Sequence, residues 1–279
     1  MVKLKELRKK STERLKGCQN DSPLADVDYI LTYLGFSKTD LILGEKEVAP
    51  STEEIFWQCI NRLESGEPVQ YITGRCEFMS LEFEVDSHTL IPRSDTEILV
   101  EMVIETAKNI PNPNILEVGC GSGCIAISLA HYIPDAKVCS IDISDGALAV
   151  ARRNAAANGV AERTEFINHN VFDGFDFCKN IPDIIVSNPP YIPKADVLTL
   201  DRKVKEFEPL TALDGGDDGL DFYRFITRNC RLSKNGYLAF EVGINQAQDV
   251  AEIMSGRFCD IKIIPDLAGI ERVVVGKMK

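Results

Sequence analysis

The segment Asn188-Pro189-Pro190-Tyr191 has residue types suited to holding a planar NH₂ group, and it follows the apolar run IIVS at 184–187. Each proline fixes its backbone and lacks an N–H donor, so the loop is stiff and its carbonyl groups are free to accept hydrogen bonds. The side-chain oxygen of Asn188 and the carbonyl of Pro189 can each accept one N–H, while Tyr191 can pack on the flat face. An amide nitrogen is a poor nucleophile, so positioning and acceptors for its protons must supply much of the catalysis. These four residues are our candidate catalytic residues, and a proline-rich surface loop is the alternative.

A glycine-rich turn stands between a predicted strand and a predicted helix, in the sequence ILEVGCGSGCIAISLA. Gly119, Gly121 and Gly123 alternate there with Cys120 and Ser122. Glycine permits a tight turn and lets a ligand approach the backbone, and free N–H groups at the helix start then face that ligand. We therefore expect the turn formed by these glycines to bind a ligand. The alternatives are a dinucleotide fingerprint, whose third glycine would stand one residue later, and a glycine turn without a ligand.

Asp142 ends the next predicted strand, KVCSID. In a parallel sheet its carboxylate lies at the same edge as the glycine turn, where it can accept both hydroxyls of a ribose. A glycine turn followed by such an acidic residue favours an adenosine-containing ligand. Because the third glycine is Gly123 and Cys124 follows it, we expect S-adenosylmethionine rather than NAD.

These residues need a sheet edge to bring them together, and the remaining sequence predicts one. From Asn114 onward, strand-like and helix-like stretches alternate, which indicates a mostly parallel α/β sheet with helices on both faces. Strands are expected at 114–118, 137–142, 163–168, 183–187, 236–242, 259–264 and 271–275, and helices at 123–132, 144–158, 218–232 and 245–256. Before that, apolar residues recur at helical spacing up to residue 65, and residues from Val69 to Pro92 favour strands and a hairpin.

The composition limits the classes of partner. A formal net charge of −12 argues against direct nucleic-acid binding, which normally uses a basic face. No apolar run approaches the roughly 20 residues of a membrane span, and the N-terminus lacks the apolar core of a secretory signal. The nine cysteines are scattered without paired CxxC spacing, so we expect no metal site and a reduced, cytoplasmic protein.

Taken together, these motifs resemble those of the release-factor glutamine N5-methyltransferases, and the resemblance covers nearly the whole chain. Besides ILEVGCGSG and NPPY, it rests on EPVQYITG at 67–74, LIPRSDTEILVE at 90–101, FEPLTALDGGDDGL at 207–220, and the tail motifs EVGINQAQ and DLAGIERVVVG. It implies a Rossmann-like, seven-stranded S-adenosylmethionine methyltransferase domain at 93–279. It also implies a small helical substrate-binding domain at 1–67, a β-hairpin linker at 68–92, and a strand 271–275 antiparallel to 259–264.

The resemblance further implies a role for each site residue. The turn from Gly119 to Gly123 would bind S-adenosylmethionine, Asp142 its ribose, and Asn170 and Val171 its adenine. Asn188 would touch both the cofactor and a substrate glutamine, and Asn188 to Tyr191 would form the substrate pocket. Four residues would form a loop that closes over the cofactor, with a helix cap as the alternative: Arg93, Asp95, Thr96 and Glu97.

The implied substrates are class I peptide chain release factors, methylated at the glutamine of a Gly-Gly-Gln motif, with S-adenosylhomocysteine as product. The chain departs from the family at three places: Val171 replaces a frequent aromatic residue, Met79-Ser80 replaces Trp-Gly, and Leu210 replaces Arg. Three alternatives stay open. A ribosomal-protein glutamine or an adenine N6 of a nucleic acid would suit the same motif, and a cofactor-binding protein without activity would share the glycine turn.

Overall fold

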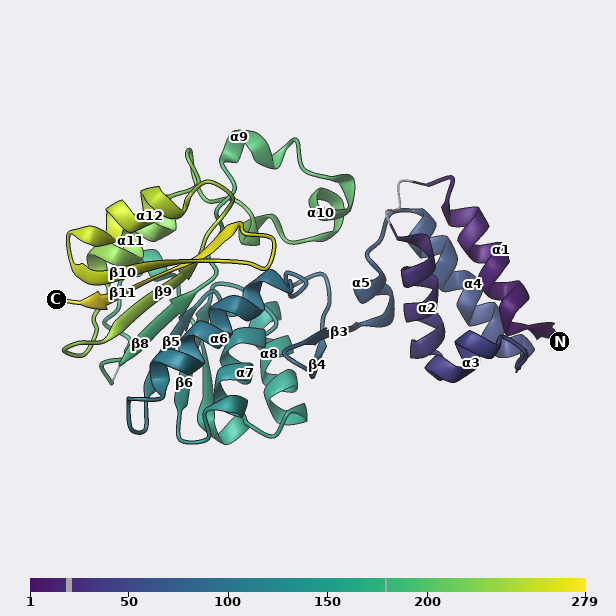
Figure 1. The fold of residues 1–279 in the computed structure, drawn as a ribbon, viewed down its shortest axis with the longest axis horizontal. Coiled ribbons are helices and arrows are strands. Elements are labelled where there is room, and N and C mark those ends of the chain that lie inside the picture. Colours follow the sequence, from purple (N-terminus) through teal and green to yellow (C-terminus); the bar gives the residue numbers. More distant parts are fainter. Residues whose placement is uncertain (19–21, 179) are drawn as a thin grey trace. The chain divides into compact units, whose positions relative to one another are not determined.

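The computed structural model describes residues 1–18, 22–178 and 180–279 (Figure 1). The chain forms two compact units. One consists of Met1–Arg75 with Asp201–Phe207, and the other of Cys76–Leu200 with Glu208–Lys279. That residues 1–67 bind the substrate, and that residues 68–92 act as a linker to a catalytic domain at 93–279, stay predictions.

The first unit is helical, as the spacing of its apolar residues predicts. Its helices are α1 (Leu4–Leu15), α2 (Pro23–Tyr33), α3 (Lys38–Leu43), α4 (Pro50–Glu64), α5 (Val69–Thr73) and α10 (Arg202–Phe207). A short antiparallel ladder joins β1 (Val2–Lys3) to β2 (Glu47–Val48). Buried apolar side chains, among them Leu7, Ile30, Leu31, Phe56 and Ile60, form its core. Helices of this length depend on such packing, because they are marginal in isolation.

The segment Val69–Thr73 is a helix, so the strand expected there is wrong. Pro68 stands at its N-cap, and the Pro68 carbonyl accepts N–H groups from Tyr71 and Ile72. Gly74 ends the helix with φ of 69°, a left-handed conformation that glycine adopts without strain. Proline before the helix and glycine after it were the local signals. They outweigh the strand preference of the apolar residues between them.

A hairpin follows, built from β3 (Arg75–Phe78) and β4 (Leu81–Glu84). Its two turn residues, Met79 and Ser80, have φ of 50° and 58°, a turn geometry that usually selects asparagine or glycine. The turn is held from both sides. The Met79 N–H donates to Glu97 Oε1 at 2.6 Å, and the Met79 carbonyl accepts from the Tyr132 hydroxyl at 2.7 Å. Met79-Ser80 therefore forms the turn without glycine.

Seven strands of the described chain form one sheet in the order β10-β11-β9-β8-β5-β6-β7. The parallel strands are β5 (Asn114–Val118), β6 (Lys137–Asp142), β7 (Thr164–Asn168), β8 (Ile184–Ser187) and β9 (Tyr237–Glu241). The strand β11 (Glu271–Met278) is antiparallel to both β9 and β10 (Phe258–Pro265). The predicted α/β fold with a mostly parallel seven-stranded sheet is confirmed.

Helices cover both faces of this sheet (Figure 1). On one face lie α6 (Asp95–Ala107), α7 (Cys124–Tyr132) and α8 (Asp145–Ala157), and on the other lie α11 (Asp221–Asn229) and α12 (Ala247–Ser255). Side chains alternate between the two cores, as strand geometry requires: Ile184 and Val186 face the first set of helices, and Ile185 faces the second. Shorter elements fill the connections: η1 (Ala161–Arg163), η2 (Val171–Asp173), α9 (Lys194–Val197) and η3 (Leu210–Ala212).

No helix in residues 1–18, 22–178 and 180–279 has the length and apolar character that crossing a membrane requires.

Candidate active site

A cavity of about 340 Å³ opens where β5, β6 and β8 end, within the second unit. Ten residues predicted for the site line it: Gly119, Cys120, Gly121, Ser122, Asp142, Asn170, Val171, Asn188, Pro189 and Pro190. Arg93 and Thr96 of the predicted closing loop line it as well. Gly123, Tyr191, Asp95 and Glu97 lie outside this lining.

The glycine turn wraps around the end of β6. The N–H groups of Gly119 and Cys120 both donate to the Ile141 carbonyl at 3.0 Å, so the turn is fixed to the neighbouring strand. Gly119 and Gly121 have φ of 87° and 52°, which side chains with a Cβ rarely adopt. No heavy atom outside the turn's own neighbours would lie within 4 Å of a Cβ at Gly121. The turn therefore leaves room for a ligand against its backbone.

Gly123 performs a packing role. It has φ of 81°, and a Cβ there would come within 2.9 Å of Ile127 Cδ1 and 3.0 Å of Ala151 Cβ. The absence of a side chain thus lets α7 and α8 approach each other closely. In the dinucleotide fingerprint this role belongs to a third glycine one position later.

Asp142 is held by two backbone N–H groups. Its Oδ2 accepts the Gly121 N–H and its Oδ1 accepts the Ser144 N–H, each at 2.9 Å. Each carboxylate oxygen has two lone-pair positions, so one remains on each after these bonds. Two ribose hydroxyls could use them. The carboxylate is therefore pre-oriented, and the same contacts stabilise the glycine turn.

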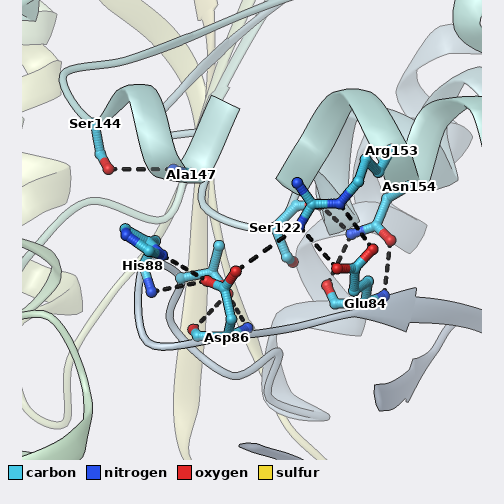
Figure 2. A network of polar contacts seen from close by, with 9 residues as sticks. Glu84, Asp86, His88, Ser122, Ser144, Ala147, Arg153 and Asn154 are labelled. Atoms are coloured by element: carbon cyan, nitrogen blue, oxygen red, sulfur yellow. Dashed lines mark hydrogen bonds and ion pairs between the residues drawn. The ribbon is translucent and has the colours of Figure 1, made fainter. Parts of the chain in front are cut away.

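A buried asparagine connects the turn to the hairpin (Figure 2). Asn154 of α8 is 2% exposed, and its Nδ2 donates to the carbonyls of Ser122 and Glu84, both at 2.9 Å. Its Oδ1 accepts the Glu84 N–H at 2.7 Å. On the surface beside it, Arg153 pairs with the Glu84 carboxylate at 2.7 Å. Asn154 therefore fixes the position of the glycine turn relative to the segment after β4.

That segment also contributes a side chain to the cavity. His88 lies against the start of α8, and a Cβ at Gly146 would meet its ring at 2.3 Å. The ring Nδ1 lies 3.0 Å from Asp86 Oδ1, which fixes its orientation (Figure 2). The sequence offered no motif that would have identified this histidine.

Glu117 lines the cavity, although no sequence motif indicated it. It is fully buried at the end of β5, and Ser140 donates a hydroxyl to its Oε2 at 2.5 Å. Its Oε1 has no hydrogen-bond partner among the described residues. Burial, with a smaller contribution from the Asp142 charge, raises the pKa of the Glu117 carboxyl to about 8. An acidic residue inside the apolar strand ILEV was the available signal, because a buried charge needs a partner.

Aromatic side chains lie next to Val171 rather than at it. Val171 is 5% exposed and packs in the core with β5 and β6. The adjacent Phe172 and the more distant Phe222 line the cavity, with ring centroids 4.9 Å apart. The two rings are tilted by 54° to each other, and each has an apolar face of the kind on which purine bases stack. The loss of an aromatic residue at 171 thus leaves the cavity with two others.

Asn188 follows β8 and lies beside the glycine turn. A Cβ at Gly119 would lie 3.8 Å from the Asn188 carbonyl oxygen, so the two loops adjoin in one cavity. The Asn188 Nδ2 donates to the Thr96 hydroxyl of α6 at 3.2 Å. Thr96 thus belongs to a polar network rather than to a simple helix cap. Tyr191 packs in the core beyond, where burial raises its pKa to about 12.

The segment after the prolines is tied to the glycine-rich stretch LDGG. Ile192 N–H donates to the Leu213 carbonyl at 3.0 Å, and Gly215 N–H donates back to the Ile192 carbonyl at 2.9 Å. A Cβ at Gly215 would meet the Pro190 carbonyl oxygen at 2.7 Å, so only glycine fits. These contacts make the NPPY loop stiff, in addition to its two prolines.

An ion pair lies at the cavity wall. Arg93 donates to the Glu208 carboxylate at 2.5 Å, and the Glu208 side chain is 2% exposed. Burial raises the pKa of Glu208, against the opposing effect of Arg93. The cost of burying this carboxylate is thus partly offset by a charged partner. Within residues 1–18, 22–178 and 180–279, no cluster of three or more His, Cys, Asp or Glu side chains could hold a metal ion.

Two family models match the chain. The PrmC N-terminal domain matches residues 6–74, and the methyltransferase small domain matches residues 92–203. Among solved structures, a methyltransferase from Pyrococcus furiosus covers 72% of this chain and 90% of its own, at 15% identity and a TM-score of 0.52. That likeness supports the methyltransferase fold alone.

Curated relatives are much more similar in sequence. A release factor glutamine methyltransferase from Moorella thermoacetica is 44% identical over 232 residues, which is 82% of this chain and 81% of the relative. One from Clostridium acetobutylicum is 35% identical over 285 aligned positions, covering 98% of both chains. Identity of this extent spans both the helical unit and the sheet with its cavity. The chain therefore belongs to the release factor glutamine methyltransferase family.

Proposed function

We propose that this chain transfers a methyl group from S-adenosylmethionine to the side-chain amide nitrogen of a glutamine in a class I peptide chain release factor. The observation that carries the proposal is the junction of the NPPY loop and the glycine turn in one cavity, where Asn188 adjoins Gly119. The glutamine would be that of the Gly-Gly-Gln motif. Relatives named for this activity support the substrate class.

The cavity residues fit the cofactor. Asp142 has lone pairs available for both ribose hydroxyls. The buried Oε1 of Glu117 lacks a partner among the described residues, and the ammonium group of a methionine moiety would supply one. Phe172 and Phe222 would contact the adenine ring. When bound, S-adenosylmethionine supplies an electrophilic methyl group on a positively charged sulfur.

The residues of this chain then act on the glutamine. Asn188 Oδ1 and the Pro189 carbonyl would each accept one proton of the substrate NH₂ group, which fixes the amide plane and directs the nitrogen. As the nitrogen–methyl bond forms, positive charge grows on these protons, and the two acceptors stabilise it. The nitrogen gains the methyl group and loses one proton to water, and S-adenosylhomocysteine is the second product. The stiff loop keeps both acceptors in place before the reaction.

The direct test is transfer of a labelled methyl group. Purified protein is incubated with labelled S-adenosylmethionine and, separately, with a class I release factor, ribosomal proteins and DNA, and the modified residue is mapped by mass spectrometry. We expect label on one glutamine of the release factor. Label on a ribosomal protein or on adenine would reassign the substrate, and no label on any of them would refute the proposal.

The proposed setting is the cytoplasm, where translation termination takes place. All nine cysteines are free thiols, which is typical of a reducing compartment.

A further inference from the structure

We infer that Glu241 is a positioning residue, whose carboxylate and the Thr96 hydroxyl hold the Asn188 amide with its nitrogen toward the protein and its oxygen toward the substrate. The inference rests on the proposed function for the identity of the substrate. It adds a residue from a different strand to the site, outside both the NPPY motif and the cavity lining.

The sheet brings Glu241 beside Asn188. In the parallel pairing of β8 with β9, Ser187 lies opposite Phe240. The next residue on each strand is Asn188 and Glu241, so both stand at the carboxyl edge. Glu241 is 3% exposed, and it alternates with Phe240 toward the face that α6 covers. Thr96, the second residue of α6, is also 3% exposed.

The hydrogen bonds decide which way the amide points. The Asn188 Nδ2 donates to the Thr96 hydroxyl at 3.2 Å, and the side chains of Thr96 and Asn188 both lie close enough to the Glu241 carboxyl to lower its pKa. An ionised carboxylate only accepts, so the amide group facing it must be the NH₂. A planar amide with its nitrogen directed at Glu241 presents Oδ1 on its other side. That is the atom the proposed mechanism needs as an acceptor.

Charged and titratable groups from three other elements surround the Glu241 carboxyl. Arg272 of β11 and Asp95 of α6 form an ion pair at 2.8 Å, and both act on Glu241 with opposite signs. Tyr191 lies on the side of the NPPY loop, and Tyr223 of α11 donates its hydroxyl to the Glu241 main-chain carbonyl at 3.0 Å. Glu241 Oε2 has no hydrogen-bond partner in the described part of the chain.

Protonation of Glu241 would weaken the arrangement. Burial is the largest influence and raises the pKa of the Glu241 carboxyl to about 7. Above that pH the carboxylate is a charged acceptor, which strengthens the bond from Asn188 Nδ2 and polarises the amide so that Oδ1 becomes a better acceptor. Below it, the neutral acid can itself donate to Asn188 Oδ1, which favours the opposite amide orientation. Methyl transfer should therefore be faster on the alkaline side of this pKa.

One test follows the amide itself and needs no substrate. In protein labelled with ¹⁵N, the Asn188 side-chain NH₂ signal is identified by its absence in Asn188→Ala. In the wild-type chain its shifts should change with pH around the Glu241 pKa, and in Glu241→Gln this change should vanish. An Asn188 signal that does not respond to pH, or that responds equally in Glu241→Gln, would overturn the inference. This outcome is independent of whether a release factor is the substrate.

The second test measures single-turnover methylation of a release factor against pH. Glu241→Ala should slow the methyl-transfer step about tenfold to a hundredfold with little change in cofactor affinity. Glu241→Gln keeps an acceptor oxygen, so it should retain more activity than Glu241→Ala but lose the alkaline rise. Asp95→Asn is the matched control, because it removes a neighbouring carboxylate that raises the Glu241 pKa. It should move the inflection to lower pH without abolishing it.

A double-mutant cycle separates positioning from general stability. If Glu241 acts through Asn188, adding Glu241→Gln to Asn188→Ala should cause no further loss of rate. Full additivity of the two losses would contradict the inference. If the proposed function itself is wrong, the wild-type chain will not transfer a methyl group to the release factor, which is a different result from additivity in the cycle.

Discussion

At the scale of single residues, Asn188 is the side chain on which the proposed chemistry depends most directly. Replacing it with alanine removes one acceptor for the substrate NH₂ and frees that amide to rotate. We expect kcat to fall about 10²–10³-fold, as for the loss of one preorganised hydrogen-bonding group. Asn188→Asp keeps an acceptor and should retain more activity. Its new carboxyl would adjoin Glu241, so the two would share a proton and this variant should prefer a lower pH than the wild type.

Single-turnover methylation of a release factor measures this effect, and cofactor affinity is determined separately. Both variants should remain folded, because Asn188 is half-buried at the end of a strand and the change in volume is small. Near-normal turnover in Asn188→Ala would remove this residue from the mechanism and leave NPPY as a structural turn.

Asp142 should determine cofactor affinity rather than the rate of transfer. Replacing it with alanine removes two bonds to ribose hydroxyls, each charge-assisted and worth about 1.5–3 kcal/mol. It also removes the acceptor for the Gly121 and Ser144 N–H groups. Calorimetry should show a large loss of S-adenosylmethionine affinity in Asp142→Ala. The affinity of Asp142→Asn should lie between those of wild type and Asp142→Ala, because asparagine keeps one neutral acceptor. Tighter binding of NAD than of S-adenosylmethionine, or an unchanged affinity in Asp142→Ala, would contradict the assignment.

At the scale of elements, Gly123 and Gly159 allow backbone strain to be separated from packing. Both have positive φ, 81° and 70°, but a Cβ at Gly159 meets nothing within 4 Å, whereas one at Gly123 collides with Ala151 and Ile127. Gly159→Ala should lose about 1 kcal/mol through strain alone. Gly123→Ala should lose about 1–3 kcal/mol more, because α7 and α8 must move apart.

Urea unfolding measures both costs, and calorimetry adds the second comparison. Only Gly123→Ala should also weaken binding of S-adenosylmethionine, since α7 begins directly at the cofactor turn. Equal stability losses in the two variants would show that the helices tolerate the extra methyl group.

The sequence predicted those parts of the site that stand at the ends of predicted strands. The glycine turn, Asp142 and NPPY each follow a strand, and the parallel order of the sheet brings them to one edge. Glu241 and Phe222 could not be found in this way, because only the strand order and the packing of helices bring them to the site. Thr96 was expected near the cofactor only through the family resemblance, as part of the closing loop. The spacing of residues along the chain does not report which way a side chain faces. Gly123 and Tyr191 were therefore predicted for the site, although they lie outside the cavity lining.

The strand and helix positions from 114 onward were predicted within a few residues, because alternation and glycine turns are local signals. Local signals that conflict are harder to weigh. Val69–Thr73 has the composition of a strand but the flanking proline and glycine of a helix, and the flanking residues prevail. The short elements α9, α10 and η3 were not predicted, since they have no extended apolar period.

At the scale of the whole molecule, two buried acids make stability depend on pH. The pKa of Glu117 is raised to about 8 and that of Glu241 to about 7, from an ordinary value of 4.5. Between the ordinary pKa of 4.5 and these raised values, the two carboxyl groups are protonated in the folded chain but ionised in the unfolded chain. Their contribution to stability is therefore full below about pH 4.5 and is lost as pH rises through the folded pKa values.

Thermal unfolding of wild type and Glu117→Gln across this range measures the Glu117 part. The difference in midpoint should change steadily between about pH 4.5 and about pH 8, with Glu117→Gln gaining relative to wild type as pH rises. Glu84→Gln serves as the surface control, because Arg153 lowers the Glu84 pKa and its effect on stability therefore changes only below about pH 4.5, so this variant should keep a constant difference from wild type across the measured range. A difference that is constant with pH would mean that Glu117 is ionised throughout.

The helical unit should matter for the protein substrate and not for the cofactor. All residues that line the cavity lie in the second unit, between His88 and Phe222. Deleting residues 1–65 should therefore raise KM for a release factor while leaving the affinity for S-adenosylmethionine nearly unchanged. A short glutamine peptide serves as the reference substrate, because it lacks the surface that the helices would contact. Unchanged kinetics on the full release factor would refute a docking role.

The order of strands also has a consequence for synthesis of the protein. The strand β11 is made after β10, yet it lies between β10 and β9. Until Glu271–Met278 has emerged from the ribosome, β9 presents an unpaired edge, which is a known site of aggregation. Arg272, whose charge lowers the Glu241 pKa, is then missing as well. A premature stop codon before β11 would thus yield an insoluble chain, and one that lacks a charge at the site that positions Asn188.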